Sequence, residues 1–125
     1  MTITFKLSRQ QELQLMQWLH RITGVGVFLF LAGHIVHIWL MGLGPEQFDS
    51  ITAVLRQPPA RLLHIFLFFS VLFHAVNGLR IILLDFVPPL ARFQRASLYV
   101  SLFVFALLFI PSALLILMDA FLPSL

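Results

Sequence analysis

The chain has 125 residues, of which 60% are hydrophobic and only 10% are charged, and its mean hydropathy is strongly positive. Because a soluble domain needs about 25% charged residues to cover its surface, this composition excludes a soluble protein and predicts an integral membrane protein. The absence of cysteine excludes a disulfide framework and a cysteine-ligated iron–sulfur cluster on this chain, and the modest net charge of +3, spread around apolar spans, does not indicate nucleic-acid binding.

Three uninterrupted apolar spans lie between charged residues, at 22–44, 62–79 and 96–118. At about 1.5 Å per residue they extend about 27 to 35 Å, so each can cross a hydrocarbon core of about 30 Å. No span has the polar face at helical period that a soluble bundle needs. We therefore expect an all-α fold, with a single membrane-anchor domain over 1–125 and transmembrane helices at about 12–43, 59–86 and 93–121.

The first helix has a recognisable start. Ser8 and Gln11 have the spacing of a capping box, which predicts a helix that begins at the inner surface and continues into the membrane. The residues before Gln17 are too polar for a signal-peptide core, so we expect the first span to act as its own insertion signal and to be retained.

The segment between the first two spans, 45–57, reads as a short amphipathic helix with Phe48, Ile51 and Leu55 on one side, and it is expected at the membrane interface. Further along, Pro111 inside the third span predicts a kink that neighbouring helices can tolerate.

The basic residues predict the orientation. One side of the spans carries Lys6, Arg9, Arg21, Arg80, Arg92 and Arg95, whereas the other carries only Arg56 and Arg61. By the positive-inside rule, the amino terminus is inside and the carboxyl terminus, after three crossings, is outside. The expected location is the inner membrane of the cell, in contact with lipid.

Histidines are the unusual side chains of the spans. His74 lies in the middle of an apolar helix, and His34, His37 and His64 have similar surroundings. An ionisable side chain at that depth costs at least about 2.5 kcal/mol unless the protein satisfies it. Because imidazole is a common axial ligand of haem iron, a buried cofactor is the first candidate. Such histidines can also cap a helix or bind a carbonyl.

Buried imidazoles need partners that this chain scarcely offers, which implies a second membrane subunit. Gly24, Gly26, Gly33 and Gly78 would let a helix or a flat macrocycle approach the backbone. For Gly26 we favour simple helix packing.

Two motifs, taken together, resemble a known family. His20-Arg21-Ile22-Thr23-Gly24 opens the first span, and the second contains His74, Gly78, Arg80 and Asp85. In this order and spacing they resemble the cytochrome b membrane-anchor subunit of succinate dehydrogenase, respiratory complex II, over nearly the whole chain. The resemblance implies half of a two-subunit haem-binding helical bundle.

The resemblance also implies site residues. His74 would be an axial ligand of haem b shared with the partner subunit, and His20, Arg21 and Arg80 would lie near quinone and the haem propionates. Arginine suits both, because it pairs with propionates and stabilises a developing oxyanion. For Arg80, inside charge with snorkelling is an equal alternative.

His34 is similar in placement to the distal haem ligand of two-haem quinol:fumarate reductase anchors. One haem b is therefore implied by His74, and a second by His34 with ligands from a partner. His37 and His64 are alternatives as outer ligands or as hydrogen-bonding residues near a haem edge.

The chain departs from the family pattern at two positions. Ile81 follows Arg80 where many members have histidine, and Gln17 stands where many have a serine that binds quinone. The Gln17 amide could donate the same bond. Trp18 could form a wall of the quinone pocket, although an interfacial tryptophan is the ordinary expectation.

The implied function is electron transfer. Succinate would be oxidised on a flavoprotein subunit, and electrons would pass through an iron–sulfur subunit to quinone near Gln17, His20 and Arg21, with haem sharing them. The alternatives are an anchor of a fumarate reductase or of another membrane cytochrome b and, less favoured, a small transporter, which would ordinarily carry a mid-span carboxylate.

Overall fold

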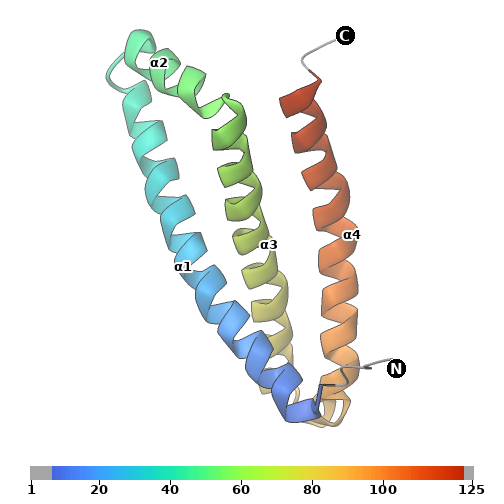
Figure 1. Cartoon of the computed structure of the whole chain (residues 1–125). Helices are drawn as coiled ribbons and strands as arrows, with labels where there is room; N and C mark the ends of the chain where they lie inside the picture. Colours follow the sequence, from blue (N-terminus) through green and yellow to red (C-terminus); the bar gives the residue numbers. More distant parts are fainter. Residues whose placement is uncertain (1–6, 123–125) are drawn as a thin grey trace.

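The computed structural model describes residues 7–122, and every element in that range is helical (Figure 1). The elements are α1 (Arg9–Met41), α2 (Pro45–Leu55), α3 (Pro58–Phe86), the 3₁₀ helix η1 (Pro88–Phe93) and α4 (Gln94–Phe121). Three helical stretches, α1, α3 and the segment 88–119, are long and apolar enough to cross a membrane. The all-α fold with three transmembrane helices is thus confirmed.

α1 begins at Arg9 rather than at about residue 12, because the predicted capping box forms at its start. The Ser8 hydroxyl accepts from the Gln11 backbone N–H at 3.3 Å, and the Gln11 side-chain oxygen accepts from the Ser8 N–H at 2.9 Å. Two backbone donors of the first turn are satisfied in this way.

α2 is the short helix predicted between the first two spans, and it folds back onto the end of α1. Its start needs Gly44, whose φ of 115° lies in the left-handed region that favours glycine. Phe48 stacks on His37 with ring centroids 4.8 Å apart, and the Thr52 hydroxyl lies 3.1 Å from His37 Nε2.

α3 is the central helix, since it packs against both α1 and α4. The core is small and lies between these three helices, with Met16, Phe73 and Leu98 buried at its centre. Figure 1 shows α1, α3 and α4 meeting at the end where α1 begins, whereas at the α2 end α4 stands apart from α1. We call the first the basal end and the second the distal end.

α1 and α3 cross closely at Gly26. A Cβ atom at this position would lie 2.3 Å from the Ser70 hydroxyl oxygen and 2.5 Å from Ser70 Cβ, and Ser70 itself is only 1% exposed. This crossing distance therefore requires glycine at position 26. Gly33, further along α1, has no atom within 4 Å of a Cβ built there.

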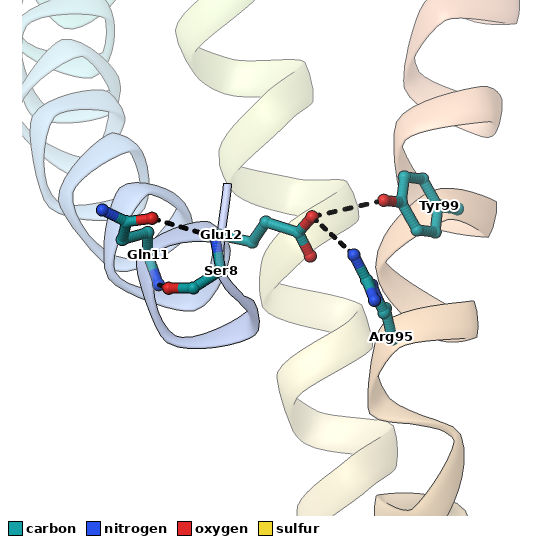
Figure 2. A network of polar contacts seen from close by, with 5 residues as sticks. All are labelled: Ser8, Gln11, Glu12, Arg95 and Tyr99. Atoms are coloured by element: carbon teal, nitrogen blue, oxygen red, sulfur yellow. Dashed lines mark hydrogen bonds and ion pairs between the residues drawn. The ribbon is translucent and has the colours of Figure 1, made fainter. Parts of the chain in front are cut away.

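A polar network joins α1 to α4 at the basal end (Figure 2). One carboxylate oxygen of Glu12 accepts from the Arg95 guanidinium at 2.9 Å and from the Tyr99 hydroxyl at 3.4 Å. The other oxygen is buried and has no hydrogen-bond partner within residues 7–122. Glu12 thus adds a polar link to the apolar cluster that already contains Met16 of α1 and Leu98 of α4.

Candidate functional site

A pocket of about 520 Å³ opens at the basal end between α1, α3, η1 and the start of α4. We call it the basal pocket. Its polar lining residues are Gln17, His20, Arg21, Asn77, Arg80, Asp85 and Gln94. Four of the residues predicted from sequence, Gln17, His20, Arg21 and Arg80, are thereby brought together from helices that are distant along the chain.

His74 lies beside this pocket, stacked on His20. The two imidazole rings are nearly parallel, with centroids 4.0 Å apart and an interplanar angle of 8°. Each ring also faces a glycine of the opposite helix. A Cβ at Gly24 would lie 3.2 Å from His74 Cε1, and one at Gly78 would lie 3.6 Å from His20 Cε1. Small residues therefore make room for both rings.

The hydrogen bond of His74 fixes its tautomer. Nδ1 lies 3.1 Å from the backbone carbonyl oxygen of His20, and because a carbonyl only accepts, Nδ1 must carry the proton. Nε2 then holds the lone pair, has no hydrogen-bond partner within residues 7–122, and is not sealed from its surroundings. An imidazole held through Nδ1 with Nε2 free is the arrangement that iron ligation requires, so this residue fits a haem.

His20 has the complementary pattern. Its Nδ1 atom is buried and has no hydrogen-bond partner in the described part of the chain, while its carbonyl also accepts from the Thr23 hydroxyl at 3.1 Å. A buried N–H without an acceptor is the costlier arrangement, so the neutral ring places its proton on Nε2. His20 is therefore a donor at the wall of the basal pocket.

Arg80 is a buried cation whose partners are all neutral. It is 7% exposed, and it donates to Asn77 Oδ1 at 3.2 Å, to the Ser97 hydroxyl at 3.2 Å and to the Gln94 carbonyl at 3.5 Å. Neither ion pair of the described residues includes it. A desolvated guanidinium at a pocket wall favours an anionic or electron-rich ligand.

Arg21, Gln17 and Trp18 lie on the more open side. Arg21 and Gln17 line the basal pocket although both are exposed. Trp18 is 61% exposed, does not line the pocket, and has the Arg21 guanidinium 5.4 Å from its ring centroid. A role for Trp18 in the pocket wall remains a prediction.

His34 is remote from the basal pocket. It is exposed on α1 beside the open space at Gly33, and its ring stacks on Phe30 with centroids 5.6 Å apart. It lies ten residues beyond Gly24, or about 15 Å along the helix. His34 and His74 therefore occupy different levels, as the sequence predicts.

The other two span histidines share a second cavity, of about 580 Å³, at the distal end. His37 and His64 line this distal pocket together with Arg56 and the ion pair between Arg61 and Asp119. The sequence groups His37 and His64 as alternative outer ligands, but it does not predict that Arg56, Arg61 and Asp119 line one cavity with them.

The sequence also leaves Asn77 unremarked, although the structure places it in the basal pocket against Arg80. A signal was present, because an amide inside an apolar span, three residues before an arginine, is as unusual as a histidine. Gln94 and Ser97 carried no such signal, since they lie at the start of α4 and contact Arg80 only through the fold.

Comparison with known proteins agrees with this picture. A family model described as Succinate dehydrogenase/Fumarate reductase transmembrane subunit matches residues 4–115. The chain is also similar to Succinate dehydrogenase 2 membrane subunit SdhC of Mycobacterium tuberculosis, with 35% identity over 97 residues that cover 78% of this chain and 71% of that protein.

Proposed function

Since this chain belongs to the succinate dehydrogenase/fumarate reductase transmembrane subunit family, we propose that it binds haem b and helps to pass electrons from an iron–sulfur subunit to quinone at the basal pocket. One observation carries the proposal. His20, Arg21 and Arg80 all line the basal pocket, immediately beside an imidazole, His74, whose Nε2 has no partner within residues 7–122.

In this proposal His74 would hold the iron of haem b, and the haem would be shared with a partner subunit. When bound, the haem supplies a one-electron relay whose potential depends on its protein surroundings. The backbone carbonyl of His20 keeps His74 in the ligating tautomer, and Arg80 and Arg21 are placed to pair with propionates. The exposed His34, beside the space at Gly33, would hold a second haem with a ligand from the partner.

Quinone binds with its head group in the basal pocket. Gln17, His20 and Arg21 can donate hydrogen bonds to a carbonyl oxygen, and positive charge nearby stabilises that oxygen as electrons arrive. Reduction to quinol takes two electrons and two protons. The Nε2–H of neutral His20 can hydrogen-bond the carbonyl oxygen, and both protons come from water on the exposed side of the pocket, beside Gln17 and Arg21. The electrons come from succinate, through the flavoprotein and iron–sulfur subunits.

The proposed assembly has this chain and a second anchor subunit side by side in the inner membrane, with the amino terminus inside. Large apolar side chains such as Phe28, Trp39 and Phe103 are exposed on the spans and suit lipid or a partner helix. The iron–sulfur subunit would dock at the basal end, where the quinone pocket opens. A fumarate reductase anchor would use the same residues in the reverse direction.

Haem content tests the proposal. We expect the purified complex to show haem b absorption, and a His74→Ala variant to lose most of the band of the basal haem in dithionite-reduced spectra. A His34→Ala variant should lose a second band if two haems are present. His37→Ala is the matched control, because its Nε2 is already engaged with Thr52, and it should keep the wild-type spectrum. An unchanged spectrum in the His74 variant would refute the assignment.

A further inference from the structure

Asn77 is a buried polar residue to which the function proposed above gives no role. It is only 3% exposed, although it lies within a membrane-spanning helix, one turn from His74. A buried amide is costly unless its groups are hydrogen-bonded, and in this case only one half of the amide has a partner.

Arg80 fixes which way the Asn77 amide points. The guanidinium lies 3.2 Å from Oδ1, and because arginine can only donate, the amide must turn its oxygen toward it. Arg80 cannot swing away, since the Ser97 hydroxyl and the Gln94 carbonyl on α4 hold the same side chain. The NH₂ group of Asn77 is consequently directed to the other side.

That NH₂ group faces the basal pocket. It donates to no acceptor within residues 7–122, yet it is not among their fully buried unpaired atoms, so it opens into a space. Asn77 borders two cavities. One, of about 10 Å³, exposes no polar atom in its wall, whereas the other is the basal pocket with its polar wall. The unsatisfied donor is therefore presented to the basal pocket.

We propose that Asn77 is a ligand-binding residue of the basal pocket, donating a hydrogen bond to an oxygen acceptor that carries partial or full negative charge. Within the function proposed above, on which this inference rests, that oxygen belongs to the quinone carbonyl or to a haem propionate. Arg80 strengthens the donor, because a cation on the amide oxygen polarises the N–H bonds. Asn77 in this way transmits the charge of a buried arginine to the ligand.

The test compares Asn77→Asp and Asn77→Leu in the whole complex. Asp keeps an oxygen toward Arg80 and removes the donor, whereas Leu removes both at similar volume. If the acceptor is the quinone carbonyl, both variants should raise the KM for quinone about tenfold, as expected for one hydrogen bond to a charge-bearing oxygen, and the Leu variant, which adds no charge, should leave the haem midpoint potential unchanged. If it is a propionate, KM should stay constant and the haem midpoint potential should fall.

Succinate oxidation with a soluble dye as acceptor bypasses the membrane anchor and should be unchanged, which reports intact flavoprotein and iron–sulfur subunits, and co-purification of the anchor with them reports assembly. Ser101→Ala is the control, because the Ser101 hydroxyl donates to the Ser97 carbonyl and the residue does not line the basal pocket. The proposal is overturned if the Asp variant keeps both the wild-type KM and the wild-type potential. Haem and quinone activity in the wild-type complex report the proposed function separately, so the two failures are distinguishable.

Discussion

At the scale of single residues, the distance between α1 and α3 depends on one pair, Gly26 and Ser70. A hydrogen atom in place of Cβ at position 26 is what lets the Ser70 side chain sit at the crossing. The Ser70 hydroxyl is itself satisfied by the Phe66 carbonyl at 3.1 Å, so close contact leaves no donor unpaired. The two helices are therefore in close contact at this point, and the buried hydroxyl keeps a hydrogen bond.

Gly26→Ala should push the two helices apart, because the new methyl group would lie 2.3 Å from the hydroxyl oxygen of Ser70. Ser70 is only 1% exposed, so its side chain has no space into which to move. We expect a loss of about 1 to 3 kcal/mol in helix association, typical of overpacking, seen as a lower thermal midpoint of the purified complex. Adding Ser70→Gly should restore much of the loss.

Gly33→Ala is the matched control for this variant, since nothing lies within 4 Å of its Cβ in this chain. A Gly26→Ala complex as stable as the wild type would contradict the packing argument. Destabilisation by Gly33→Ala, in contrast, would show that another molecule covers that face of α1.

At the scale of helices, α1 and α4 each pack on α3, and Glu12 with Arg95 and Tyr99 supplies their polar link. The second oxygen of Glu12 is buried without a partner within residues 7–122, and an unpaired acceptor at this site costs less free energy than an unpaired N–H donor would. A carboxylate is thus preferred over an amide at this position.

Glu12→Gln should weaken the basal end, because it removes the charge that pairs with Arg95 and places a buried NH₂ without an acceptor. We expect the thermal midpoint of the complex to fall by several degrees at low salt, and the deficit to shrink as salt screens the lost ion pair. Asp49→Asn, an exposed change on α2 outside both described ion pairs, is the control and should be neutral. Equal midpoints for the two variants would exclude this role.

The helices and their ends are predictable because their signals are local. Ser8 and Gln11 act on one turn, Gly44 and Pro45 set the start of α2, and the apolar spans have the length that a bilayer needs. The kink at Pro111 stays a prediction. α4 is one continuous helix through this residue, and the bend of such a helix depends on the helices that pack against it.

At the scale of the whole molecule, the chain buries little of its apolar surface by itself. The most apolar window of the segment 88–119 has none of its residues buried, and that of α1 has 11%. Membrane helices need no hydrophobic core of their own, so these faces are left for lipid and for a partner subunit. The basic residues then fix which way the bundle is inserted.

The orientation can be tested by cysteine labelling, since the chain contains no cysteine of its own. Asp49→Cys on α2 should react with a membrane-impermeant maleimide in intact spheroplasts. Gln10→Cys at the start of α1 should react only after the membrane is dissolved in denaturing detergent. The inverse pattern would reverse the proposed topology.

The site is only partly predictable from sequence. The family resemblance assigned His20, Arg21 and Arg80 to one region, and all three line the basal pocket. The stacking of His74 on His20 and the contact of Ser97 with Arg80 could not be predicted, since they depend on the rotation and register of one helix against another. Apolar spans without polar faces carry little information about either.

α1 and α3 each place a histidine against a glycine of the other helix, and this reciprocal packing affects how the two helices align in the membrane. In a lipid bilayer, two apolar helices have no preferred register from hydrophobic burial, because sliding one helix past the other exposes no apolar surface to water. A slip of one turn, about 5.4 Å, would take both imidazoles off their glycines together and leave the Nδ1 proton of His74 without its carbonyl. Because both contacts are lost together, a misaligned pair of α1 and α3 leaves polar atoms unpaired in the hydrocarbon and is less stable than the aligned pair. The apolar environment therefore favours the native register of the two helices.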